Sequence, residues 1–260
     1  VKHDDCRARA SDQVQRGTGT VLTRGVPFVG RENERALLSR TFERVVREHR
    51  MAAVYVPGES GVGKTALVHE FTDEVEGDRS RVVVLRGRCY ERETVPYKAF
   101  DGVLDALTRF LRTLGDAECE QLLPRRAHAL PMVFPVLGRV KAITWHTGPR
   151  FTDVDRATLR THALSALREL LARLSGRYAM VIVIDDLQWA DAESLALLLD
   201  LTNGAEAPPL MLIATARDPD ECPAEVQSAL EMLMEQAPMS ERMRLEGLPL
   251  EVHTRSGQPW

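Results

Sequence analysis

A glycine-rich motif follows a short apolar run in the first quarter of the chain. Residues 58–65 have the sequence GESGVGKT, which matches the pattern G-x-x-x-x-G-K-[ST] of phosphate-binding loops. The preceding residues 51–56 predict a buried strand, and residues 65–71 have the apolar spacing of a helix. In this context the glycines let backbone N–H groups converge on an anion at a helix N-terminus. The motif therefore predicts a phosphate-binding loop.

The residues of this loop have distinct expected roles. The Lys64 ammonium is expected to reach the β- and γ-phosphates of a nucleotide, and the Thr65 hydroxyl is expected to ligate Mg²⁺. The sequence thus predicts that ATP or ADP binds here with Mg²⁺. The loop residues predicted to contact nucleotide are Gly58, Glu59, Ser60, Gly61, Val62, Gly63, Lys64, Thr65 and Ala66.

Two adjacent acids follow a second apolar strand. Residues 179–184 are continuously apolar and precede Asp185 and Asp186. A buried acid at a strand end is costly unless it meets a cation or hydrogen-bond donors. Beside a phosphate loop, Asp185 is therefore expected to hold Mg²⁺ through water, and Asp186 to polarise the attacking water. The other role open to such acids is a helix N-cap, which we predict for Asp191.

Two further segments are candidates for the site. Arg217 follows the apolar residues 210–214, and its spacing fits equally an arginine that reaches the γ-phosphate and an exposed arginine in a turn. Phe28 and Val29 precede the first predicted helix, where they fit either a purine pocket or a hydrophobic staple. Arg31 is included with them among the predicted nucleotide-binding residues.

Strand-like and helix-like segments alternate between these motifs. Helical apolar spacing marks five segments, namely residues 36–49, 65–75, 97–114, 156–174 and 192–201. Short apolar runs predict strands at residues 51–56, 81–86, 179–184 and 210–214, with a weak strand near residues 243–245. Continuously apolar strands that alternate with helices indicate a parallel sheet covered on both faces. The predicted fold class is an α/β P-loop NTPase with a parallel central sheet flanked by helices.

The same patterns predict the domain limits. One ATPase domain is expected over residues 26–250, with an irregular insertion of short helices at residues 117–153, where prolines interrupt the pattern. The polar residues 1–25 are predicted to be a disordered linker, and residues 251–260 an unstructured tail.

The bulk composition narrows the partners and the compartment. A net charge of −4 and a pI near 6.0 give no reason to expect a nucleic-acid-binding surface. No apolar run approaches the roughly 20 residues of a membrane span, and no signal peptide is recognisable. The four cysteines form no C-x-x-C pair, which favours a reducing compartment. We therefore expect a cytoplasmic protein without membrane contact.

Taken together, the motifs FVGRENE, GESGVGKT, VIVIDDLQWAD and IATARD resemble the STAND class of AAA-related signal-transduction ATPases, found in LuxR-like regulators and large bacterial signalling proteins. The resemblance covers roughly residues 26–250. Within it, GRCYERE and VPYK look like the ATPase module of bacterial proteins that carry a serine/threonine kinase domain upstream. The resemblance implies a nucleotide-dependent switch that works with other domains or proteins of a signalling pathway.

Two departures from the family bear on activity. Ring-forming AAA enzymes usually have Glu where this chain has Asp186, and the shorter side chain predicts slow hydrolysis. The family's helical lid and winged-helix region are expected after the last strand, so we expect the sequence to be truncated before the lid. Protein-kinase motifs are absent from the sequence, so this chain is not expected to be a kinase of that fold.

Two alternatives remain beside the switch with weak hydrolysis. The first is an origin-recognition-type AAA ATPase that acts on DNA, which shares the G-R-E box. The second is a truncated nucleotide-binding module without turnover.

Overall fold

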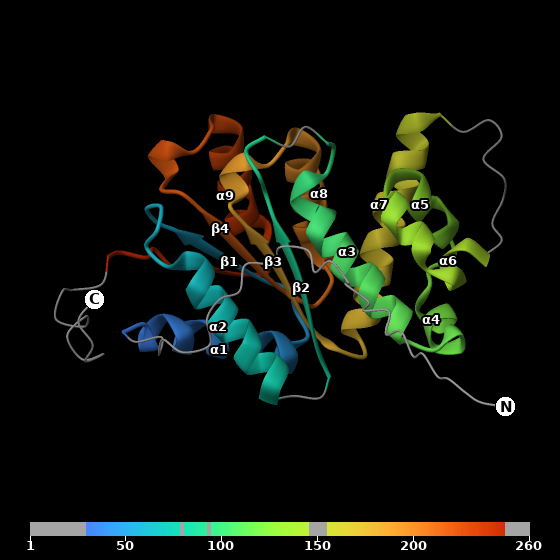
Figure 1. Cartoon of the computed structure of the whole chain (residues 1–260), viewed down its shortest axis with the longest axis horizontal. Coiled ribbons are helices and arrows are strands. Elements are labelled where there is room, and N and C mark those ends of the chain that lie inside the picture. Colours follow the sequence, from blue (N-terminus) through green and yellow to red (C-terminus); the bar gives the residue numbers. More distant parts are fainter. Residues whose placement is uncertain (1–29, 79–80, 93–94, 146–154, 248–260) are drawn as a thin grey trace, which may run out of the picture.

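The core of the protein is one five-stranded parallel sheet (Figure 1). The structure, a computed structural model, describes residues 30–78, 81–92, 95–145 and 155–247. The strands are ordered β2-β3-β4-β1-β5 across the sheet. Their bounds are β1 Ala52–Pro57, β2 Val82–Arg88, β3 Ala179–Asp185, β4 Met211–Ala216 and β5 Met239–Arg242.

Helices cover both faces of the sheet, because successive apolar side chains along each strand point to opposite faces and both faces must be buried. In β1, Val54 packs with Phe42 and Phe71 on one face, whereas Ala53 belongs to the larger core on the other face. Helices α1 (Glu32–Glu48) and α2 (Lys64–Asp78) cover the first face. The second face is covered by α3 (Lys98–Thr113), α7 (Arg156–Ser175), α8 (Ala192–Thr202) and α9 (Ala224–Gln236). This arrangement confirms the predicted α/β class with a parallel sheet flanked by helices.

Strand order brings three loops to the same edge of the sheet. Because β4 lies between β1 and β3, Pro57 is paired with Ala216, and Ile184 with Ala214. The carboxyl ends of parallel strands meet at one edge. The phosphate loop, the paired acids and the residues after β4 therefore lie side by side, although they are far apart in the sequence.

Short helices form a separate cluster beside the sheet, at the right of Figure 1. They are α4 (Asp116–Leu122), α5 (Leu130–Val133) and α6 (Lys141–Trp145), and α5 packs against α7. They lie in the described part of the segment where the sequence predicts an insertion, whose limits stay a prediction. No helix in the described part of the chain is long and apolar enough to cross a membrane.

Some expectations from the sequence were wrong or fall outside the described residues. The last strand is Met239–Arg242 rather than residues 243–245, where Leu245 forms a single bridge to Gly58. Helix α9 was not predicted, and α1 begins at Glu32 rather than near residue 36. The predicted linker (residues 1–25) and tail (residues 251–260) lie outside the described residues.

Candidate nucleotide-binding site

The phosphate loop connects β1 to α2 with a backbone that glycine makes possible. Gly61 and Gly63 have φ values of 81° and 99°, in the left-handed region that side chains rarely adopt. A Cβ at either position would meet no atom within 4 Å, so backbone conformation rather than space requires glycine here. Helix α2 begins at Lys64, which leaves the first N–H groups of the helix facing the loop.

The Lys64 ammonium is held by the loop itself. Lys64 is 7% exposed, and its Nζ donates hydrogen bonds to the carbonyl oxygens of Gly58 (2.7 Å) and Glu59 (2.8 Å). Burial lowers the pKa of Lys64, and the nearby carboxylates of Asp186 and Asp185 oppose this shift. The amine is therefore positioned at the mouth of the loop, where phosphate oxygens can replace its carbonyl partners.

The two predicted magnesium ligands are in direct contact. Asp185 ends β3 and is 7% exposed, and the Thr65 hydroxyl donates to its Oδ2 at 2.7 Å. The hydroxyl of Thr215, at the end of β4, donates to Oδ1 of the same carboxylate. One hydroxyl and one carboxylate at the start of a phosphate-loop helix are oxygen donors of the kind that Mg²⁺ prefers. These residues would therefore suit a magnesium ion.

Asp186 is held differently from its neighbour. It adopts a left-handed backbone conformation with φ of 59°, and its backbone N–H donates to the Thr215 hydroxyl at 3.1 Å. Its carboxylate accepts hydrogen bonds from Arg88 Nε at 2.9 Å and from Gln188 at 3.1 Å, and it lies 2.8 Å from Arg88 Nη2 in an ion pair. Burial works against the charge of Arg88, but the Asp186 and Asp185 carboxylates outweigh it and raise the Arg88 pKa. Asp186 is therefore ion-paired.

Arg217 follows β4 and lines the same cleft as the phosphate loop. Its guanidinium stacks 5.4 Å from the centre of the Trp189 ring and lies 3.7 Å from Glu221. Its backbone N–H donates to Gln188 at 3.2 Å. The side chain is 38% exposed, so both roles predicted for it remain predictions.

A cleft of about 420 Å³ joins these groups. It lies between the phosphate loop, the start of α2, the segment after β3 and the segment after β4. The residues that line it are Ser60, Gly61, Gly63, Lys64, Thr65, Ala66, Arg88, Asp186, Gln188, Trp189 and Arg217. The cleft thus brings together most of the predicted loop residues with two of the predicted catalytic side chains beyond the loop.

Arg31 lies against the loop backbone. It is 6% exposed, and its guanidinium donates to the carbonyl oxygens of Val62 and Glu246 and to the Glu34 carboxylate. The phosphate loop is thus tied to the segment after β5, and contact of Arg31 with nucleotide stays a prediction. Phe28 and Val29 lie outside the described residues.

Asp191 is the N-cap that the sequence predicted. Its carboxylate accepts from the Ser194 backbone N–H at 3.2 Å at the start of α8. It also accepts from the backbone N–H groups of Tyr97 (3.0 Å) and Lys98 (3.1 Å), where α3 begins. One carboxylate therefore joins the starts of two helices beside the paired acids.

Four residues near the site were not given a role from the sequence. Arg88, Gln188 and Trp189 line the cleft, and Thr215 is buried behind it, hydrogen-bonded to Asp185 and Asp186. Thr215 carried a usable signal, because it is a hydroxyl residue within a fully buried apolar strand. Little in the sequence pointed to Arg88, because its position next to Asp185 depends on the pairing of β2 with β3.

A parallel sheet in the order β2-β3-β4-β1-β5, with a phosphate loop after β1 and paired acids after β3, defines a P-loop ATPase fold. Residues 27–213 match the AAA ATPase domain family. The chain therefore belongs to that family.

Two proteins of known sequence are similar to parts of the chain. An uncharacterized protein of Rhizobium meliloti is 22% identical over 196 residues, which cover 74% of this chain and 19% of that protein. Cell division control protein 18 of Schizosaccharomyces pombe is 36% identical over 66 residues, which cover 25% of this chain and 11% of that protein. The chain thus spans a minor part of these relatives.

Among solved structures, the Aeropyrum pernix ORC1 protein in complex with DNA matches with a TM-score of 0.50 at 17% identity, covering 89% of this chain and 49% of that one. Cdc6p from Pyrobaculum aerophilum matches with a TM-score of 0.45 at 12% identity, and the match covers 88% of this chain and 48% of that one. At these identities the likeness to ORC1 shows the fold alone.

Proposed function

We propose that this domain binds ATP and ADP with Mg²⁺, hydrolyses ATP slowly, and acts as a nucleotide-dependent switch. The observation that carries the proposal is the contact of Thr65 with Asp185 at the mouth of the loop that holds Lys64. These residues come from two strand ends far apart in the sequence. A chance glycine-rich turn would not need a buried acid beside it.

Each side chain then has a role set by its position. Lys64 would bind the β- and γ-phosphates, and Thr65 and Asp185 would hold the magnesium ion. Bound Mg²⁺ would neutralise charge that develops on the phosphates. Asp186 would orient the attacking water, and Arg217, which lines the same cleft, would contact the γ-phosphate.

The ion pair of Asp186 supports slow hydrolysis. A carboxylate that accepts hydrogen bonds from Arg88 and Gln188 is a weaker acceptor for a water proton than a free one. The Asp186 side chain is also shorter than the Glu of ring-forming AAA enzymes, which should slow hydrolysis further. Turnover is therefore expected well below the roughly 1–10³ s⁻¹ of ordinary enzymes.

The signalling role is supported by the sequence motifs that resemble the STAND class. By that resemblance, the partners are other domains or proteins of a signalling pathway, among them a serine/threonine kinase domain. The scattered cysteines support a cytoplasmic compartment. The working unit is residues 26–250, with the insertion at residues 117–153.

A second candidate is an ATPase that acts on DNA. It is favoured by the likeness in fold to the ORC1 protein, which was solved with DNA. The net charge of −4 favours the switch instead. Fluorescence anisotropy with duplex DNA, in Mg²⁺ and ATP at physiological salt, distinguishes the DNA-acting ATPase from the switch. Saturable DNA binding would support the DNA-acting ATPase, and its absence would support the switch.

Paired variants of the two acids test the proposed roles. Asp185→Asn removes a magnesium-binding charge, so it should weaken ATP binding in Mg²⁺ by about tenfold or more and change binding little in EDTA. Asp186→Asn should leave affinity largely intact and lower the hydrolysis rate. Calorimetry and phosphate release measure the two effects, and identical profiles for the two variants would contradict the separate roles.

A further inference from the structure

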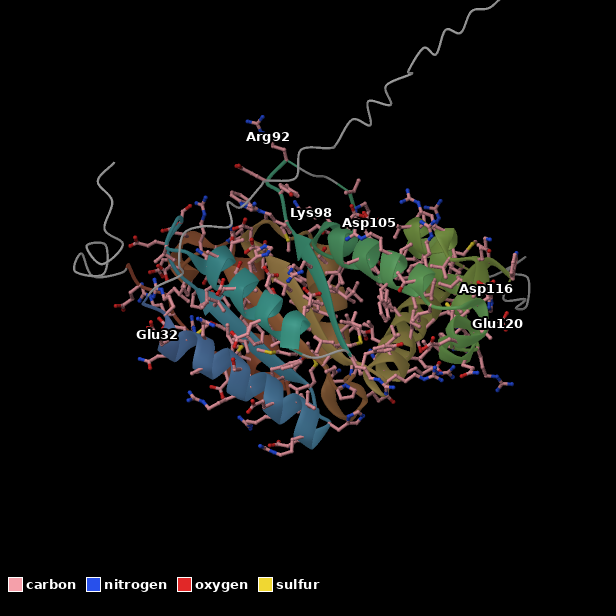
Figure 2. All side chains as sticks on the ribbon, turned by 60° about the horizontal axis from the view of Figure 1, so that its bottom comes forward. Glu32, Arg92, Lys98, Asp105, Asp116 and Glu120 are labelled. Carbon is pink, nitrogen blue, oxygen red and sulfur yellow. The ribbon has the colours of Figure 1, made fainter. Side chains whose placement is uncertain are left out.

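A second cavity lies beside the nucleotide cleft, at the sheet edge formed by β2. It has a volume of about 320 Å³ and lies between α2, β2 and the first turn of α3. Figure 2 shows Lys98 at the start of α3, near the carboxyl end of β2. The side chains of Thr65 and Arg88 line both this cavity and the cleft. Its occupant would therefore touch the candidate ATPase site.

Two glycines give this cavity fixed walls. A Cβ on Gly102 of α3 would lie 2.9 Å from the Cα of Gly87 in β2, and a Cβ on Gly87 would lie 2.8 Å from the Ala99 carbonyl oxygen. Helix α3 therefore packs backbone to backbone against the end of β2. Both glycines line the cavity, so this part of its wall is made of closely packed backbone rather than mobile side chains, which suits a preformed small-molecule site.

The charged side chains that line the cavity limit how much negative charge a ligand could carry there. Arg86 is paired with Asp73 and Glu76 on α2, at 2.8 and 3.1 Å. Arg88 is paired too, with Asp186, and Lys98 is 8% exposed, with its Nζ 3.3 Å from the Tyr90 carbonyl oxygen. A ligand anion would therefore meet these two cations beside or in place of their present partners. Two acids also line the cavity, Asp101 and Asp185. A dianion would meet repulsion from these acids, whereas a single charge would not be strongly opposed.

The remaining wall is apolar. Val68 of α2 and Val183 of β3 line one side, and the exposed ring of Tyr90 lines the mouth. Cavities of roughly 300 Å³ or more with apolar walls and a few polar groups are typical of small-molecule sites. We propose that this cavity binds a small carboxylate with an aromatic or aliphatic body, whose carboxylate lies between Lys98 and Arg88.

Such a ligand would be an effector of the ATPase, and this second step rests on the proposed function. The Arg88 guanidinium donates to Asp186 in the structure and also lines the cavity. A carboxylate in the cavity competes with Asp186 for that guanidinium. Release of Asp186 frees its carboxylate to orient water, so ligand binding should raise the hydrolysis rate.

Benzoate and its neutral analogue benzamide test the site without nucleotide. In two-dimensional NMR titrations of the whole chain, benzoate should shift the backbone amides of His69, Gly87 and Lys98, and benzamide should bind about tenfold more weakly or worse. Lys98→Gln should weaken benzoate binding by a similar factor. The matched variant Lys64→Ala should leave it unchanged.

Two outcomes would overturn the site itself. One is the absence of shifts with benzoate. The other is loss of benzoate binding in Lys64→Ala with retention in Lys98→Gln, which would place the anion in the phosphate loop. Because no nucleotide is present, these outcomes do not depend on whether the domain binds ATP.

Phosphate-release assays test the coupling. Benzoate should raise the wild-type rate, Lys98→Gln should keep the basal rate and lose the response, and Arg88→Gln should have a raised basal rate and no response. Benzoate that binds without changing the wild-type rate would overturn the effector role. Failure of ATP to bind would refute the proposed function and leave the carboxylate site standing.

Discussion

Asp185 and Asp186 are neighbours in the sequence with different environments. Two hydroxyls donate to the Asp185 carboxylate, which holds it beside the phosphate loop, where we propose that it binds Mg²⁺. Asp186 turns away in a left-handed conformation and pairs with Arg88. Thr215 connects the two acids, because its hydroxyl donates to one side chain and accepts from the backbone N–H of the other. At the scale of single residues, Thr215 is therefore the part of the site most open to test.

Thr215→Val keeps the shape of the side chain and removes both hydrogen bonds. The partly buried N–H of Asp186 and the buried Asp185 carboxylate would each lose a partner, so the free energy of unfolding should fall by about 1–3 kcal/mol. The control is Thr108→Val, since the buried Thr108 hydroxyl donates to a carbonyl within its own helix and the change should be small. Urea denaturation measures both, and equal losses would contradict this role of Thr215.

At the scale of elements, the contact of α3 with β2 predicts opposite effects for two glycines in helices. Gly→Ala in a helix normally stabilises by up to about 1 kcal/mol. A Cβ added at Gly77 in α2 would meet no atom within 4 Å, so Gly77→Ala should keep or raise the melting temperature. At Gly102 the added methyl would meet backbone atoms of β2 at 2.9 and 3.0 Å, so Gly102→Ala should lower it. Thermal unfolding that ranks the variants the other way would refute the close packing.

The Asp191 cap predicts a pH dependence of stability. Burial raises the pKa of Asp191, but hydrogen bonds from Ser194 and Tyr97 outweigh it and hold the pKa below its ordinary value. A group whose pKa is lower in the folded state stabilises above its unfolded pKa, and that contribution is lost as the pH falls through the folded pKa. Asp191→Ala should therefore cost about 1–2 kcal/mol at neutral pH, and the difference from wild type should shrink below about pH 4.

Asp155 offers the matched control for this experiment. Its carboxylate caps α7 alone, through the Thr158 backbone N–H at 2.6 Å, so Asp155→Ala should lower stability less than Asp191→Ala. Denaturant unfolding across the pH range measures both variants. A constant difference between Asp191→Ala and wild type down to low pH would contradict the role of the ionised cap.

Local patterns predicted the elements well, and long-range pairing explains what they missed. The strand, loop and helix around Lys64 are contiguous, so the sequence was sufficient to predict them. The ion pair of Arg88 with Asp186 requires β2 to lie next to β3, which periodicity does not specify. The last strand was placed too late because Met239–Arg242 is a short edge strand with exposed polar residues, whereas residues 243–245 contain two buried apolar side chains.

At the scale of the whole molecule, one claim is central, that the cleft at the carboxyl edge of the sheet binds nucleotide. Family membership and fold support the claim, and the positions of Lys64, Thr65 and Asp185 give it a physical basis. The loop lysine is the sharpest test, because its ammonium is held at the mouth of the loop. Lys141 of α6 is an exposed lysine outside the cleft and serves as the control.

The decisive measurement is the Kd of ATP with Mg²⁺, determined by calorimetry for wild type, Lys64→Ala and Lys141→Ala. Loss of one partner of a buried charged hydrogen bond costs about 2–5 kcal/mol, so Lys64→Ala should raise the Kd by at least about tenfold. Lys141→Ala should leave the Kd unchanged, and circular dichroism should show both variants folded. An unchanged Kd in a folded Lys64→Ala variant would contradict the assignment of the phosphate loop.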